Sequence, residues 1–194
     1  MNFLAHIYLS FGDEEVTIGN FIADSIRGNK YAHLPQRVQK GVLLHREIDT
    51  FTDAHPIPKI SSKRLHANYS HYSRVIVDIF YDHFLAKNWL QYSKVPLDRY
   101  VDDFYDLLES NYTLLPLATQ RMMPYMVADN WIFNYASLQG IANVLQGMNR
   151  RTKHRSGMHN AILDLERNYH RFEEEFTAFF EELIIFSQHK YNTL

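Results

Sequence analysis

The spacing of apolar side chains is the feature that most constrains the fold of this chain. Apolar residues recur three and four positions apart along most of the sequence, whereas alternating runs of β-branched residues are scarce. A period near 3.6 is typical of amphipathic helices. We therefore predict an all-α fold, with Gly28, Pro35, Pro56 and Pro96 dividing the helices. Further helices are expected over 72–91, 97–111, 117–123, 131–147 and 158–188.

The composition predicts one globular domain. Of the 194 residues, 46% are apolar and 14% are aromatic, which is enough to bury one substantial core. No repeat or low-complexity linker divides the chain, so residues 1–194 are expected to form a compact single-domain helical bundle. The aromatic residues Phe172, Phe176, Phe179 and Phe180 have helical spacing and are predicted to pack in the core.

Charge and residue usage exclude several classes of function. The net charge of −2 gives no electrostatic case for binding nucleic acid. Because there is no cysteine, a metal site has to use His, Asp and Glu. No apolar run is long enough to span a membrane. The N-terminus lacks a basic leader and soon meets acidic residues, so we expect a cytoplasmic protein. The sequence does not indicate an oligomeric state.

Two short segments combine imidazole and carboxylate groups in apolar, helix-forming surroundings. His45 and Asp49 are four residues apart, so they project from one helix face, and Asp53 continues that line. Asp82 and His83 lie in a mostly apolar run, where charged groups are seldom buried unless they are paired or bind a metal. These segments predict a metal site of the kind used in hydrolysis.

Asp24 and His6 lie in similarly apolar surroundings and are added to the candidate site. The alternative is structural. In that case His45 and Asp49 form an i,i+4 pair, Asp82 caps a helix or forms a salt bridge, and His6 is hydrogen-bonded in the core. The recurrence of such residues on three otherwise apolar segments favours the metal site.

Further short motifs accompany these residues. They are Asn2-Phe3-Leu4-Ala5-His6, Gly19-Asn20, Ala23-Asp24, Arg27-Gly28, His45-Arg46, Ile48-Asp49, Thr52-Asp53, Asp82-His83-Phe84-Leu85, Trp131, Asn143-Val144-Leu145 and Gly147-Met148. Together they resemble the acyl carrier protein phosphodiesterase family over nearly the whole chain. The resemblance implies an all-helical relative of the HD phosphohydrolases that depends on a divalent cation, usually Mn²⁺, and is connected with fatty acid biosynthesis. It also implies hydrolysis of the phosphodiester that joins 4′-phosphopantetheine to a serine of holo-acyl carrier protein.

The resemblance also implies a site at the matching positions. HD enzymes carry a histidine, a His-Asp doublet and an aspartate, whereas this chain has an inverted Asp-His doublet. Asp49 would take a proton from a water molecule whose pKa the ion lowers, and Asp53 would orient a ligating imidazole. The implied ligands are Asp24, His45, Asp82 and His83, with His6 and Asp49 as further ligands or as residues that orient them.

Basic residues are expected to bind the substrate. Arg27 and Arg46 would stabilise the phosphate in the transition state or, alternatively, form salt bridges. A small acidic carrier protein should dock on a positive surface. The first candidate surface is Arg150, Arg151, Lys153 and Arg155, followed by Lys59, Lys63 and Arg64, and the alternative for the first is a solvated loop.

Two rival functions stay open from the sequence. An HD-type hydrolase acting on a small phosphate ester or nucleotide would use the same ligands without a docking surface for a carrier. A non-catalytic helical binding module would keep the fold and bind no divalent ion. The first of these is the main alternative to the carrier phosphodiesterase.

Overall fold

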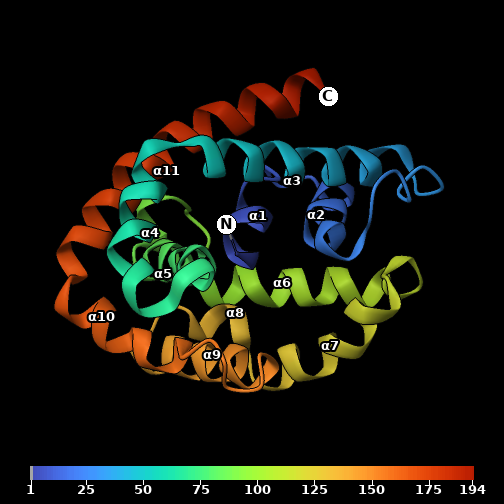
Figure 1. Ribbon diagram of the computed structural model, residues 1–194. Coiled ribbons are helices and arrows are strands. Elements are labelled where there is room, and N and C mark those ends of the chain that lie inside the picture. Colours follow the sequence, from blue (N-terminus) through green and yellow to red (C-terminus); the bar gives the residue numbers. More distant parts are fainter. Residues whose placement is uncertain (1) are drawn as a thin grey trace.

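The computed structural model describes residues 2–194, and Met1 lies outside the described residues. Over this range the chain is helical almost throughout and forms no strand, which confirms the predicted all-α fold. Figure 1 shows the short helix α1 near the centre, with longer helices around it. The α-helices are α1 (Phe3–Tyr8), α2 (Glu14–Ile22), α3 (Gln36–Ala54), α4 (Pro56–Tyr69), α5 (Ser73–Lys87), α6 (Leu97–Ser110), α7 (Leu117–Ala128), α8 (Trp131–Asn134), α9 (Leu138–Arg151), α10 (Ala161–Arg167) and α11 (Tyr169–Thr193).

Proline sets several helix boundaries, as predicted. Pro35 and Pro96 directly precede α3 and α6, where a fixed φ and a missing N–H cost little. Two long predicted helices are each divided in the structure. The first, predicted over 131–147, is divided into α8 and α9, because the Ser137 hydroxyl accepts a hydrogen bond from the Gly140 N–H and starts α9. The second, predicted over 158–188, is divided at Asn168 into α10 and α11. The predicted helix over 117–123 continues beyond its expected end to form α7.

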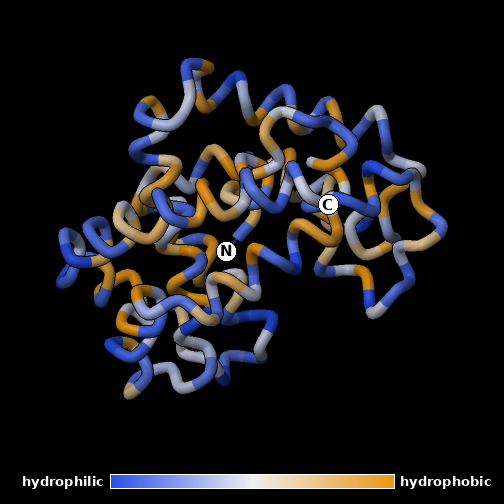
Figure 2. The backbone as a smooth tube through the Cα atoms, turned by 90° about the horizontal axis from the view of Figure 1, so that it is seen from above, coloured by the Kyte–Doolittle hydropathy of each residue, from blue (hydrophilic) through white to orange (hydrophobic). Residues whose placement is uncertain are grey.

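A hydrophobic core joins the helices. α11 packs against α3, α4 and α5, and the side chains of Phe172, Phe176, Phe179 and Phe180 are fully buried, which confirms their predicted place in the core. Hydrophobic and hydrophilic residues alternate along the helices in Figure 2, as amphipathic packing requires. No helix within the described part of the chain is both long and apolar enough to cross a membrane.

Two glycines allow α2 and α3 to approach very closely. A Cβ atom at Gly19 would lie 2.0 Å from a carbonyl oxygen of α3, and one at Gly41 would lie 2.2 Å from a carbonyl oxygen of α2. Since no larger residue fits without moving the helices, the glycines fix their separation. Asn20 directly follows the first glycine, and His45 lies one turn after the second. The close contact therefore positions the residues of the candidate site.

Candidate metal centre

Four side chains converge where α1, α3 and the short 3-10 helix η1 (Ala23–Ser25) meet. His6 comes from α1, Asp24 from η1, and His45 and Asp49 from α3. The two Asp49 oxygens lie 3.3 Å from Nε2 of His6 and 3.1 Å from Nε2 of His45. An oxygen of Asp24 lies 3.3 Å from the same nitrogen of His45. The structure thus brings together four of the predicted site residues. Three of them, His6, His45 and Asp49, offer ligand atoms within 4.8 Å of one another.

The imidazoles are held from behind by one residue. Their rings stack with centroids 3.9 Å apart and planes 16° apart. Nδ1 of His6 lies 2.8 Å from Asn20 Oδ1, and Nδ1 of His45 lies 2.8 Å from the Asn20 backbone oxygen. Both histidines are buried, whereas the Asp49 and Asp24 side chains are 44% and 77% exposed. The Nε2 atoms of the two histidines therefore face carboxylates that are partly open to solvent.

Burial and the carboxylates set the protonation states of the group. Burial and the neighbouring His45 lower the pKa of His6 to about 4. Burial opposes a proton on His45, but hydrogen bonds to Asp24 and Asp49 outweigh it and raise the pKa of His45 to about 9. Although burial acts in the opposite direction, the hydrogen bond with His45 and the nearness of the His6 ring hold the pKa of Asp49 well below its usual value. The hydrogen bond with His45 also lowers the pKa of Asp24. The two carboxylates therefore stabilise a positive charge beside the Nε2 atoms of the histidines.

These residues fit a divalent cation. Imidazole nitrogens and carboxylate oxygens are the ligands that Mn²⁺, Fe²⁺ and Zn²⁺ accept. Nε2 of His6 is buried and makes no hydrogen bond within the described part of the chain, although it faces the Asp49 carboxylate. A lone pair that faces a carboxylate oxygen is unfavourable, and a cation between the two atoms removes the conflict. The donor set and this buried nitrogen together define a candidate metal centre.

Asp82, a predicted ligand, does not lie in this group and has other partners. Its side chain is fully buried, and its oxygens accept hydrogen bonds from the N–H groups of Leu4 at 2.8 Å and Ala5 at 3.2 Å. Burial raises the pKa of Asp82 to about 7, although these hydrogen bonds oppose the shift. Asp82 therefore holds the N-terminus of α1, the helix that carries His6. This is the capping role considered as the structural alternative.

His83, the second residue of the predicted doublet, is also separate from the group. Its Nδ1 lies 2.7 Å from the Tyr135 backbone oxygen, so this nitrogen donates. Its Nε2 lies 2.7 Å from the Tyr169 hydroxyl. Both ring nitrogens are therefore engaged in joining α5 to the segment after α8 and to α11. A buried His-carboxylate doublet on an apolar helix was equally compatible with this structural role.

Other predicted residues have different partners from those expected. Arg46 donates to backbone carbonyl oxygens of the loop after η1 and packs over the Tyr31 ring, so its geometry does not support a role at the phosphate. Arg27 is exposed and lines a second, smaller pocket of about 550 Å³. Asp53 pairs with Arg74 at 3.6 Å. The residue behind the imidazoles is Asn20, which the sequence did not single out for this role.

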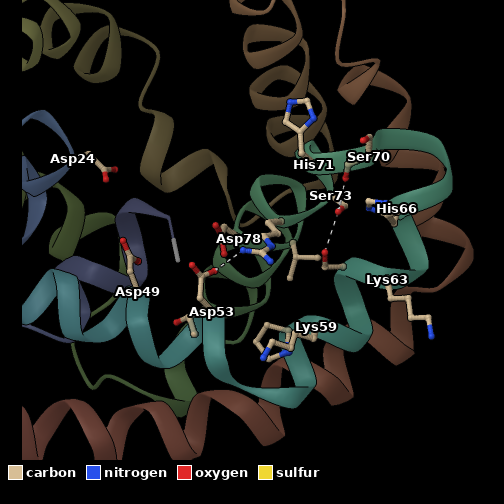
Figure 3. A pocket seen from close by; sticks show the side chains of 15 residues that line it. Asp24, Asp49, Asp53, Lys59, Lys63, His66, Ser70, His71, Ser73 and Asp78 are labelled. Carbon is tan, nitrogen blue, oxygen red and sulfur yellow. Dashed lines mark hydrogen bonds and ion pairs between the residues drawn. The ribbon is translucent and has the colours of Figure 1, made fainter.

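A cleft of about 820 Å³ opens beside the group and carries opposite charges at its two ends. Figure 3 shows the labelled aspartates on one side of the view and Lys63, His66 and His71 on the other. Arg74 also lines the cleft and pairs with Asp53 at the acidic end. Asp78 was not predicted, although its place one turn before Asp82 in the same apolar helix was a usable signal. No sequence pattern pointed to the two histidines of the basic end. The acidic end comprises Asp24, Asp49, Asp53 and Asp78, and the basic end comprises Lys59, Lys63, His66 and His71.

The predicted first docking surface lies elsewhere. Arg150, Arg151, Lys153 and Arg155 are exposed at the end of α9 and in the following loop, and they do not line the cleft. Of the second predicted set, Lys59 and Lys63 line the cleft, whereas Arg64 forms an ion pair with Glu175 on α11 at 2.5 Å. The structure therefore places two of the predicted basic residues in the cleft that the candidate centre adjoins.

The fold and the site together define an all-α protein with a candidate metal centre at one end of a charged cleft. The family model of acyl carrier protein phosphodiesterase matches residues 1–183, and the chain belongs to this family. Acyl carrier protein phosphodiesterases of Yersinia pestis and Pectobacterium atrosepticum are each 31% identical to it, covering 98% and 95% of this chain and 99% and 96% of their own. That of Photorhabdus laumondii is 32% identical over 98% of this chain and 96% of its own. No solved structure matches significantly.

Proposed function

We propose that this protein hydrolyses the phosphodiester between 4′-phosphopantetheine and a serine of holo-acyl carrier protein, releasing apo-carrier and 4′-phosphopantetheine. The observation that carries the proposal is the convergence of His6, His45 and Asp49 in a chain of the acyl carrier protein phosphodiesterase family. The relatives from Yersinia pestis and Photorhabdus laumondii bear the name of that activity. The proposed cofactor is a divalent ion, Mn²⁺, as the family resemblance implies.

In this proposal His6, His45 and Asp49 hold the ion, and Asp24 completes the group from the solvent side. A divalent ion supplies Lewis acidity, which polarises a phosphoryl oxygen and lowers the pKa of a water molecule. Two carboxylates and two neutral imidazoles balance its double positive charge. The buried imidazoles fix the position, while the more exposed carboxylates leave an approach for the phosphodiester from the cleft.

The role of proton acceptor, expected for Asp49, is assigned here to Asp78. The pKa of Asp49 is held well below its usual value by the two imidazoles, which makes it a weak base and a good ligand. Asp78 lines the same cleft. Burial, aided by the neighbouring Asp49 and Asp53 charges, raises the pKa of Asp78. A carboxylate with a raised pKa accepts a proton more readily.

The basic end of the cleft is the proposed recognition surface. Lys63 and His66 lie on α4, and His71 lies on η2 (Ser70–Tyr72). All three line the cleft that Asp49 also lines. A small acidic protein would be attracted by these side chains while its phosphodiester reaches the acidic end with its ion. This arrangement gives the cleft two functions, which are recognition at one end and chemistry at the other.

The test is to incubate purified protein and Mn²⁺ with holo-acyl carrier protein and to follow the mass of the intact carrier. The expected result is loss of the phosphopantetheine mass, its abolition by a chelator, and its restoration by excess Mn²⁺. An unchanged carrier mass with folded, metal-loaded protein would overturn the proposal. Turnover of a small phosphate ester under the same conditions would then favour the alternative HD-type hydrolase.

A further inference from the structure

Asn20 occupies a unique place behind the candidate centre. Its side chain is fully buried on α2, next to the close contact with α3. Its side-chain and backbone oxygens each lie 2.8 Å from Nδ1 of a different histidine. One residue thus contacts both imidazoles on the side opposite to Asp49.

The hydrogen bonds fix which way the Asn20 amide points. Its Nδ2 donates to the His6 backbone oxygen at 2.8 Å and to the Ser10 hydroxyl at 3.1 Å. The backbone oxygen can only accept, and the Ser10 hydroxyl donates its own proton to that same oxygen at 2.9 Å. The NH₂ group must therefore face these two acceptors. The amide oxygen is left facing Nδ1 of His6.

The same reasoning fixes the proton positions on both rings. An amide oxygen and a backbone oxygen only accept, so Nδ1 of His6 and Nδ1 of His45 both have to donate. In neutral imidazole a proton on Nδ1 leaves the lone pair on Nε2. Nε2 is the atom that both rings turn toward Asp49.

We infer that Asn20 is a positioning residue that holds both histidines with Nδ1 as the donor, so that each ring presents its Nε2 atom toward a cation. The inference rests on the metal centre of the proposed function. Without the amide oxygen, a proton on Nε2 of His6 would form a hydrogen bond to Asp49, 3.3 Å away, and block the lone pair. His45 would be spared, because its acceptor is the Asn20 backbone oxygen, which every substitution keeps.

The test compares Asn20→Ala with Asn20→Asp in the metal-free protein. The proton positions are read from the ¹⁵N resonances of the histidine rings. In wild type we expect His6 to carry its proton on Nδ1. Asn20→Ala should move it to Nε2 while Nδ1 of His45 stays protonated, and calorimetry should show Mn²⁺ binding 10- to 100-fold more weakly. Asn20→Asp keeps an acceptor for His6 and should restore the Nδ1 proton and most of the affinity.

Ser10→Ala is the matched control, because it removes a partner of Asn20 without touching either ring. It should leave the protons of both rings in place. Mn²⁺ affinity should stay within about threefold of wild type, which is a smaller loss than removal of a group that orients a ligand causes. A proton on Nε2 of His6 in wild type, or an unchanged His6 resonance in Asn20→Ala, would overturn the inference. These spectra need no substrate. The inference about Asn20 can therefore fail while the protein still hydrolyses the carrier, and it can hold while the protein does not hydrolyse the carrier.

Discussion

Two pairs of a histidine and an aspartate, His45 with Asp49 and His83 with Asp82, both lie on predicted helices, but their side chains have different partners. His45 and Asp49 share one helix face and meet at 3.1 Å, as their spacing predicted. His6 joins them from α1, and sequence spacing could not show that encounter because it depends on tertiary packing. Asp82 and His83 lie apart from them, and the sequence could not show this because a buried polar residue on an apolar helix can bind a metal or satisfy backbone groups equally well.

Substituting His45 and His83 separates these roles. His45→Asn should weaken Mn²⁺ binding by at least about tenfold, because it removes one ligand nitrogen. His83→Gln should leave Mn²⁺ affinity within about twofold and lower the free energy of unfolding by about 1–3 kcal/mol, since buried partners lose hydrogen bonds. Calorimetric titration and urea unfolding measure the two effects. Loss of metal affinity in His83→Gln alone would restore the doublet as the ligand site.

The pH dependence of metal binding follows from the raised pKa of His45. With a pKa of about 9, His45 carries a proton at neutral pH in the metal-free protein, and an ion must displace that proton. Mn²⁺ affinity should therefore rise about tenfold per pH unit below pH 9, with one proton released per ion. His6, with its pKa lowered to about 4, should release none above pH 5. Calorimetry in buffers of different ionisation enthalpy counts the protons, and zero release at pH 7 would contradict this assignment.

Asp78→Asn tests the assigned proton acceptor. The amide keeps the size of the side chain but cannot accept a proton from water, so we expect kcat to fall by about 10²- to 10⁴-fold. Mn²⁺ affinity should change by less than about threefold, because removing a ligand or a group that orients one costs more. Steady-state kinetics on holo-carrier and a metal titration give the two values. A joint loss of affinity and rate would instead make Asp78 a ligand.

At the scale of the helix, the position of α1 depends on its cap. Asp82 accepts two hydrogen bonds from the first turn of α1, so Asp82→Ala leaves two buried N–H groups without an acceptor. We expect the free energy of unfolding to fall by about 2–4 kcal/mol. Asp82→Asn keeps one acceptor and should lose about half as much. Urea unfolding of both variants tests this, and a stability loss below about 0.5 kcal/mol in Asp82→Ala would contradict the cap.

The contact between α2 and α3 gives a second test at this scale. A Cβ atom at Gly19 would overlap a carbonyl oxygen of α3, so Gly19→Ala should separate the helices and lower the free energy of unfolding by at least about 2 kcal/mol. Gly147→Ala on α9 is the control, because the nearest atom to its Cβ is 3.9 Å away and alanine favours helix. It should stabilise the protein by up to about 1 kcal/mol. If both substitutions changed the free energy of unfolding equally, the close contact between α2 and α3 would not require glycine.

Helix type was predictable from the sequence, whereas helix division was only partly so. The period of apolar residues identified helices, and proline marked the starts of α3 and α6. The same period continues across the Ser137 cap and across Asn168, so it gave one helix where the structure has two. A periodic pattern reports which face is buried and does not report where the chain turns.

At the scale of the whole molecule, the candidate centre is assembled from the first fifty residues, while the later helices build the core around it. The centre takes its residues from α1, η1 and α3, and α4 and η2 supply the basic end of the cleft. A segment as strongly basic as the end of α9 is easy to find in sequence. Its position outside the cleft lining is a property of the packed chain, which the sequence alone does not show.

Charge reversal decides between the two docking surfaces. Lys63→Glu places a negative charge at the basic end of the cleft and should raise KM for holo-carrier by about tenfold through repulsion. The same change at Arg150, an exposed residue outside the cleft lining, is the matched control and should leave KM within about twofold. Hydrolysis of a small phosphodiester such as bis(p-nitrophenyl) phosphate should be unchanged in both variants, because neither residue belongs to the metal group.

A raised KM in Arg150→Glu alone would transfer docking to the end of α9. No change in either variant would mean that the carrier is not held by these charges, and electrostatic docking through the cleft would fail.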